Sequence, residues 1–315
     1  MPISDPSIPL RVLDVLCEAA IPFAVLHGEE LIGSDTLLSD VDVVVGQPVS
    51  AVIGGILEGI EAAGLRIALR WPYDLGDGTS SVFFTTPNGD QGAQVDLLYD
   101  PRGLGRYGLR SNAILNDSVP GRRYRVPSEL DRHLYLLQKR LRKHQLGRAV
   151  TEQERLVDAF TAREGVERAR ILFSADSRDR IIATLEARET RLRFRLPSTV
   201  RNLPRRLGRI RRPIGFWVEL VGSDEVAERL ASALESRFSR WLVVTGRGRR
   251  PSGGSVIPWR MWAVSQVRLR AGLYVSWTSV PRSPRADLTI HLQDGDDLES
   301  LAPRVVAAMA ERLAL

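Results

Sequence analysis

The stretch Asp40-Val41-Asp42-Val43-Val44 decides the fold prediction for this chain. Its valines are typical of a buried strand, and alternate side chains of a strand lie on the same face of the sheet. Asp40 and Asp42 are therefore predicted to share one face, with the intervening valine on the other. Two neighbouring carboxylates repel each other unless a cation binds between them. Paired aspartates provide the oxygen ligands that Mg²⁺ prefers, together with the phosphates of a substrate.

A third acid, Asp96, lies in the middle of another apolar stretch at residues 93–99, and Gly28 supplies a turn before the first two acids. Three acids on neighbouring strands indicate a metal-dependent centre for phosphoryl or nucleotidyl transfer. The alternative is that the Asp-x-Asp pair is solvated charge on an edge strand. The conjunction of the glycine turn, the apolar flanks and the third acid favours the metal centre.

In this order of elements the first third of the chain resembles the DNA polymerase beta-like nucleotidyltransferase superfamily. The resemblance implies that Asp40 and Asp42 bind two Mg²⁺ ions together with a nucleoside triphosphate. It also implies that Asp96 is the third metal ligand and helps to activate the attacking hydroxyl. These three residues form the predicted catalytic and metal-binding set, and Gly28 and Ser39 are predicted to contact the nucleotide.

The chain contains only two lysines, Lys139 and Lys143, among many arginines. They are four residues apart in a stretch that is predicted to be helical, so they lie on one face of the helix. An ammonium group suits a triphosphate as a compact point charge, and nucleotidyltransferases often place a helical subdomain over the nucleotide. Both lysines are therefore predicted to bind nucleotide phosphates. The alternative is two surface lysines on a solvated basic helix.

The predicted fold class is α/β, with a nucleotidyltransferase-like mixed sheet in a first domain at residues 1–125. Hydrophobic periodicity and turn residues there predict a small sheet with helices on one side. The helices are predicted at residues 9–20 and 49–63, and the strands at 22–26, 40–44, 65–71, 81–85 and 94–99.

A helical subdomain and basic linker are predicted at residues 126–205. Helical periodicity runs from residue 127 to about residue 189, with a glycine break at Gly147. Residues 191–212 are rich in arginine and contain prolines, so they are predicted to form a linker or hinge.

The third predicted domain, residues 206–315, begins with a strand at 214–224 that runs into a glycine turn and a helix at 226–238. This order resembles the opening of P-loop kinases of the thymidylate kinase type, and residues 285–292 resemble one of their later strands. A working phosphate-binding loop ends in Lys and Ser or Thr, whereas this turn continues through Asp224 without a lysine. The resemblance implies a degenerate kinase-like α/β domain, retained for packing, dimerisation or substrate capture. Proteins that join the two kinds of domain form a bacterial group.

Residues 246–254 are rich in glycine and arginine and predict a flexible basic loop. Four aromatic residues lie after its start, namely Trp259, Trp262, Tyr274 and Trp277. They are predicted to fill the core of the second sheet, in preference to stacking on nucleic acid bases.

The composition predicts a globular protein that binds polyanions. The net charge is +6 and the pI is about 9.9, which favours nucleic acid, nucleotide or phosphorylated partners. The arginine bias of a GC-rich genome explains the same charge without any binding role. No stretch is long and apolar enough to cross a membrane and the N-terminus has no signal core, so a cytoplasmic protein without membrane contact is predicted. The single cysteine, Cys17, argues against disulfides and a cysteine-based zinc site.

The predicted function is that of a Mg²⁺-dependent transferase, a nucleotidyltransferase that takes ATP or another nucleoside triphosphate as co-substrate. It would move a nucleoside monophosphate to a hydroxyl or phosphate acceptor, and replacing Asp42 would abolish transfer with little loss of folding. The alternative is a non-catalytic nucleotide- or RNA-binding scaffold derived from a nucleotidyltransferase and kinase fusion. This alternative is favoured by Glu29, where the superfamily usually has Gly or Ser. It is also favoured by the lack of a lysine in the turn that resembles a phosphate-binding loop. The sequence leaves open whether the protein binds RNA and whether it forms a homodimer.

Overall fold

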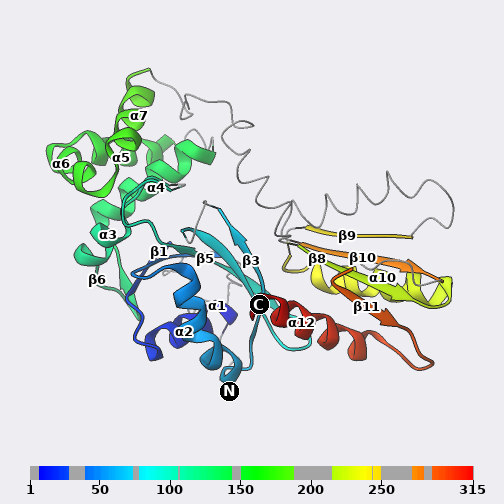
Figure 1. Ribbon diagram of the computed structural model, residues 1–315. Coiled ribbons are helices and arrows are strands. Elements are labelled where there is room, and N and C mark those ends of the chain that lie inside the picture. Colours follow the sequence, from blue (N-terminus) through cyan, green and yellow to red (C-terminus); the bar gives the residue numbers. More distant parts are fainter. Residues whose placement is uncertain are drawn as a thin grey trace.

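The computed structural model shows an α/β protein with two separate main sheets (Figure 1). It describes residues 7–27, 40–73, 78–105, 107–143, 150–187, 215–242, 244–249, 272–279 and 286–314. Gly28, Ser39, Gly147, the basic linker at 191–212, Trp259 and Trp262 lie outside these ranges, so the predictions for them stay predictions.

The first sheet has five strands in the order β1-β2-β5-β4-β3. Its strands are β1 (Phe23–His27), β2 (Asp40–Val45), β3 (Arg66–Pro72), β4 (Ser80–Thr85) and β5 (Gly92–Leu98). β2 and β5 are parallel, and the other neighbours are antiparallel. The mixed sheet predicted from the alternating apolar residues is therefore confirmed, with bounds within two residues of the prediction.

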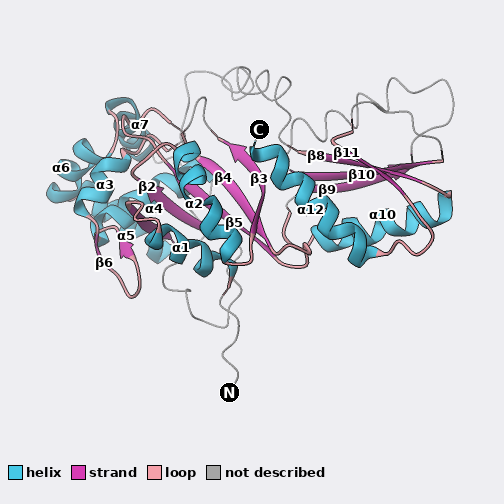
Figure 2. Cartoon of the chain, turned by 60° about the horizontal axis from the view of Figure 1, so that its bottom comes forward, coloured by secondary structure: helices cyan, strands magenta, loops and turns pink. Residues whose placement is uncertain are grey.

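Two helices, α1 (Ile8–Glu18) and α2 (Val49–Ala62), cover one face of this sheet, as Figure 2 shows. Val41 and Val43 of β2 point into this core, together with Val95 and Leu97 of β5. The remaining residues of β2 and β5 point to the opposite face because side chains alternate along a strand. The acids are on that opposite face.

Helices also cover the opposite face, so the prediction of helices on one side only is wrong. A helical group packs there against Ala24, Leu26, Val44 and Leu98, whose apolar side chains need burial. The group is formed by α3 (Ser111–Asp117), α4 (Glu129–Lys143), α5 (Val150–Thr161), α6 (Arg163–Leu172) and α7 (Ala175–Glu186). A short hairpin of β6 (Val119–Pro120) and β7 (Arg125–Val126) lies between α3 and α4 in the sequence.

The second sheet has four parallel strands in the order β11-β8-β10-β9. These strands are β8 (Phe216–Val221), β9 (Val244–Arg249), β10 (Gly272–Thr278) and β11 (Leu288–His291). Residues 246–249 belong to β9, so the loop prediction is wrong for them. Gly246, one of the glycines that suggested a loop, gives room to a neighbour, since a Cβ there would lie 3.3 Å from the ring of Tyr274. Tyr274 and Trp277 are buried, as predicted.

One hydrophobic core joins the two sheets. It contains Ala68, Leu69 and Phe83 of the first sheet as well as residues of α10 (Asp224–Phe238) and α12 (Leu298–Ala314). Figures 1 and 2 both show α12 between β3 and the second sheet. In addition, the Trp241 indole donates to the carbonyl of Gly89 at 3.0 Å, in the turn between β4 and β5. In the described ranges, every helix is too short or too polar to cross a membrane.

Candidate functional site

Asp42 and Asp96 lie side by side on adjacent parallel strands. Asp42 of β2 is in direct register with Asp96 of β5, and both carboxylates are on the face opposite α1 and α2. Their side chains are 2% and 5% exposed. Burial of an ionised carboxylate is costly unless it is paired or coordinates a cation. The two acids therefore need partners, and each has a different set.

Asp96 is held by polar side chains of its own sheet. Ser81 of β4 is in register with Asp96 and its hydroxyl donates to Oδ1 of the carboxylate. Gln94, two residues before Asp96 on the same face, donates to Oδ1 at 2.8 Å. The hydroxyl of Tyr73 lies 2.8 Å from the hydroxyl of Ser81. The hydrogen bonds to Oδ1 fix the orientation of the Asp96 carboxylate.

Asp42 is neutralised by a residue from the helical group. The ammonium of Lys139 on α4 forms an ion pair with Oδ2 of Asp42, and its side chain is only 12% exposed. The same ammonium lies 5.7 Å from the ring centroid of Tyr135, a favourable cation–π distance. A cation thus does lie against the acid, as the repulsion argument requires, but this cation belongs to the chain itself.

Tyr135 closes the site from α4 and is completely buried. Burial and the nearby carboxylate of Asp42 raise the pKa of its hydroxyl well above the usual value. Lys139 follows Tyr135 by four residues, so both side chains lie on one face of α4. This face of the helix points at the acids on the sheet.

The position of α4 is fixed by two buried polar contacts. The Arg168 guanidinium of α6 donates to both carboxylate oxygens of Asp131 at 2.6 Å, and Asp131 is fully buried. Arg168 also donates to the carbonyl of Ala113 on α3 at 2.9 Å. Near the other end of α4, the Gln138 amide donates to the carbonyl of Tyr107 at 2.7 Å. These contacts hold the helix that carries Lys139 against the sheet.

The other predicted site residues are placed as follows. Asp40 is the first residue of β2 and is in register with Gln94, while its side chain lies outside the description. Lys143 is exposed at the last residue of α4. Within the described part of the chain, no three acids, histidines or cysteines are grouped so as to hold a metal ion. The structure thus brings together Asp42, Asp96 and Lys139.

Sequence reasoning missed Ser81, Gln94 and Tyr135. The alternation of side chains along a strand offered a signal for two of them. It places Gln94 on the same face of β5 as Asp96, and it places Ser81 on the same face of β4 as Phe83. Tyr135 also carried a signal, because it precedes Lys139 by one helical turn.

No model of a known protein family matches the chain, and no curated protein matches its sequence. The chemistry of the site is therefore judged from its side chains. They offer two buried carboxylates, one ammonium and a hydroxyl-bearing shell around them.

Proposed function

We propose that this chain is a Mg²⁺-dependent nucleotidyltransferase that moves a nucleoside monophosphate from a nucleoside triphosphate to a hydroxyl or phosphate acceptor. The observation that carries the proposal is the register of Asp42 with Asp96 on adjacent parallel strands, with both carboxylates buried. Lys139 balances only one of these two charges, and two neighbouring buried carboxylates are costly unless both charges are balanced. Asp40, two residues before Asp42 on β2, is the third member of the proposed set.

The donor set fits Mg²⁺. This ion takes oxygen ligands and is usually held by one or two carboxylates together with substrate phosphates. Asp42 and Asp96 supply the two carboxylates, and Gln94 and Ser81 hold the second of them in place. When bound, Mg²⁺ would neutralise developing charge on the phosphates and lower the pKa of the attacking hydroxyl.

The residues of the chain would then have distinct roles. Asp42 and Asp40 would hold the nucleotide-bound cation. Asp96 would accept the proton of the acceptor hydroxyl as the hydroxyl oxygen attacks the α-phosphorus. The bond from that phosphorus to the bridging oxygen breaks, and pyrophosphate leaves. Lys139, which pairs with Asp42 in the structure, would pair with the triphosphate in the complex. Lys143, one turn further along α4, would reach the same phosphates.

The finer architecture forms part of the proposal. We take residues 1–125 as a nucleotidyltransferase-like domain, 126–205 as a helical subdomain with linker, and 206–315 as a degenerate kinase-like domain. The last assignment is supported by the parallel second sheet and by the start of α10, which directly follows β8. Asp224 and Glu225 occupy the first turn of α10, and Asp224 pairs with Arg249. Acids at this helix end repel a phosphate.

The experiment is a transfer assay with radiolabelled ATP, CTP, GTP and UTP, Mg²⁺ and candidate acceptors. The proposal expects label transfer by the wild type, and a loss of about a hundredfold or more in Asp96→Asn, because the proton acceptor is removed. Gln91→Ala is a matched control, because Gln91 is exposed in the turn before β5. Full turnover by Asp96→Asn would contradict the assignment.

A second candidate function is a non-catalytic nucleotide- or RNA-binding scaffold, and the Asp42 to Lys139 ion pair favours it. Lys139 already supplies a cation to Asp42, so this carboxylate does not depend on a metal ion for a partner. Calorimetric titration with ATP or CTP distinguishes the two functions. The enzyme requires nucleotide binding that strengthens with Mg²⁺, whereas the scaffold shows nucleotide or RNA binding that is independent of Mg²⁺.

A further inference from the structure

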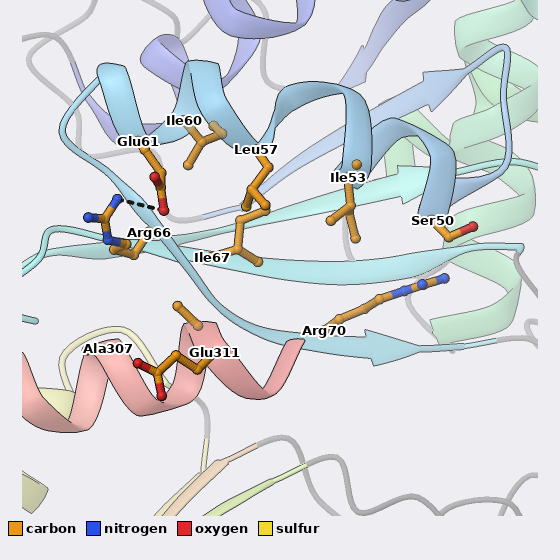
Figure 3. Close-up of a pocket in the computed structure, with 12 residues that line it drawn as sticks. Ser50, Ile53, Leu57, Ile60, Glu61, Arg66, Ile67, Arg70, Ala307 and Glu311 are labelled. Atoms are coloured by element: carbon orange, nitrogen blue, oxygen red, sulfur yellow. Dashed lines mark ion pairs between the residues drawn. The ribbon is translucent and has the colours of Figure 1, made fainter. Parts of the chain in front are cut away.

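A groove of about 570 Å³ lies where α2, β3 and α12 meet (Figure 3). Ile67, which lines it, belongs to the core beneath α1 and α2. The groove is thus on the opposite face of the first sheet from Asp42 and Asp96. Its volume is within the range of sites that bind small ligands, and nothing in the proposed transfer reaction uses it.

The middle of the groove is apolar. Ile53 and Leu57 of α2 face Ile67 of β3 across it, and Ala307 of α12 forms the opposite wall (Figure 3). Leu57 is 39% exposed, and among the described residues it is one of four large apolar side chains that are exposed. An apolar ligand segment that covered Leu57, Ala307 and the exposed part of Ile53 would gain about 25 cal/mol for each Å² removed from water.

Gly54 keeps the helix wall of the groove open. A Cβ added there would meet no atom within 4 Å, whereas a Cβ at Gly59 would lie 2.7 Å from Val15. Packing inside the folded chain therefore explains Gly59 and does not explain Gly54. A glycine within a helix costs about 1 kcal/mol relative to alanine. Access for a ligand to the helix backbone is a reason to keep it.

The two ends of the groove carry opposite charge. At one end Arg70 extends toward Ser50 (Figure 3), next to the N-terminus of α2, which has no acid in its first turn and no side-chain cap. At the other end lie Glu311 of α12 and Glu61 at the C-terminal end of α2, where Glu61 pairs with Arg66 at 3.0 Å. The helix dipole of α2 has the same polarity, positive at the Arg70 end and negative at the Glu61 end.

The length of the groove matches a short extended peptide. Ser50 and Glu61 are eleven residues apart on α2, which corresponds to about 16 Å along the helix axis. An extended chain rises about 3.3 Å per residue, so four or five residues span this length. Among the strands that the structure describes, β3 is also an edge strand, and extended peptides commonly lie along sheet edges.

We propose that this groove binds a short, mostly apolar peptide with free ends. Its carboxylate lies at the Arg70 end, its amino group lies at the Glu311 end, and its side chains cover Ile53, Leu57 and Ala307. A fatty acid of equal length satisfies the Arg70 end but places apolar carbon against Glu311. The peptide matches both ends.

The test is calorimetric titration of the full chain with the pentapeptide Ala-Val-Ala-Leu-Ala, with the same peptide acetylated and amidated at its ends, and with dodecanoate. Gly54→Trp fills the groove, and Gly55→Trp is the matched control. A Cβ at Gly55 makes only an ordinary contact of 3.8 Å with Ile21, and any residue other than proline improves on glycine within a helix. Glu311→Gln removes the charge at the exposed amino end without touching the core.

The proposal expects the free pentapeptide to bind the wild type and Gly55→Trp equally. Binding should be weaker by about tenfold or more for Gly54→Trp, for Glu311→Gln and for the end-blocked peptide, which corresponds to about 1.4 kcal/mol. Absence of peptide binding to the wild type overturns the proposal. Equal binding to Gly54→Trp, or tighter binding of dodecanoate than of the peptide, also overturns it. No nucleotide is present, so the result is independent of the transfer reaction.

Discussion

At the scale of single residues, the ion pair between Lys139 and Asp42 controls the site. It joins a helix to a strand that lies about a hundred residues earlier in the chain, and both partners are largely buried. Two consequences follow for Asp42. A metal ion that binds this carboxylate competes with Lys139 for its charge, and removal of the acid leaves an ammonium in the interior. The expectation that Asp42 can be replaced with little loss of folding is therefore revised.

Asp42→Asn should lower the free energy of unfolding by about 3 kcal/mol, because breaking a buried pair leaves one charge without its partner. Urea unfolding followed by circular dichroism measures this loss. The double variant Asp42→Asn with Lys139→Met removes both charges and should recover most of the lost stability while staying inactive. A single variant as stable as the wild type would show that the pair is not buried in solution.

Tyr135 reports on the same site through pH. The folded protein raises the pKa of this hydroxyl, so the stability it contributes is complete below the unfolded pKa of about 10 and is lost as pH rises above it. Between pH 9 and pH 11 the free energy of unfolding of the wild type should fall by about 1.4 kcal/mol because of this residue. The reason is that the Tyr135 hydroxyl ionises in this range only in the unfolded chain. Tyr135→Phe should lack this part of the loss in urea unfolding at the two pH values. Identical pH dependence of the two proteins would contradict the burial of Tyr135 beside Asp42.

Part of this site could be predicted from the sequence and part could not. Alternation along a strand was enough to predict that Asp40 and Asp42 share a face, because strand geometry is local. The register of Asp42 with Asp96 joins two strands, and Asp96 was included because it lies in an apolar stretch and because of the family resemblance. The ion pair depends on where α4 docks, and no local pattern determines that position. Lys139 was therefore predicted as a phosphate ligand, and its contact with Asp42 was not foreseen.

At the scale of elements, the position of α4 decides whether Lys139 and Tyr135 reach the sheet. The helix is held by the buried contact of Asp131 with Arg168, which also ties α6 to α3. Burial raises the pKa of Asp131 even though Arg168 opposes the shift. The element that carries the site residues thus depends on a charge pair distant from the acids.

Arg168→Met should destabilise the protein by about 3 kcal/mol, because it leaves the fully buried Asp131 carboxylate without its guanidinium partner. It should also weaken nucleotide binding, since α4 loses its anchor. Arg163→Met is a suitable control, because the side chain of Arg163 on the same helix is 92% exposed. Chemical denaturation and calorimetry measure the two effects, and equal behaviour of the two variants would contradict the anchoring role.

Most helices and strands of the first sheet could be predicted because apolar periodicity and turn residues agree there. β9 could not, since Gly246 and Gly248 look like loop residues until Tyr274 is seen to pack over the first of them. α3 and α12 were missed as well. α12 owes its place to apolar contacts with both sheets, which are set by the tertiary fold.

At the scale of the whole molecule, the core shared by the two sheets predicts that they unfold as one cooperative unit. Phe83 of β4 is completely buried and packs in the same core as α10 and α12. The turn between β4 and β5 adds a hydrogen bond to Trp241. Sequence reasoning divided the chain into domains, whereas the packing couples the first sheet to the second.

Phe83→Ala should lower the stability of the entire protein by about 4 kcal/mol, through lost burial and the cavity left behind. Far-ultraviolet circular dichroism reports all helices and strands, and among the described residues tryptophan fluorescence reports Trp71 of the first sheet together with Trp217, Trp241 and Trp277. The two signals should show the same single unfolding transition, and in the variant both should shift by the same amount. Two transitions, with only one of them shifted, would show that the sheets unfold independently.

The most direct test of the central claim is a crystal of the protein soaked with Mn²⁺ and nucleoside triphosphates, with anomalous diffraction used to locate the metal. The account predicts an anomalous peak between the carboxylates of Asp40, Asp42 and Asp96, nucleotide density beside it, and Lys139 moved from Asp42 toward the phosphates. A site without metal, in which Lys139 still contacts Asp42 at saturating nucleotide, would contradict it.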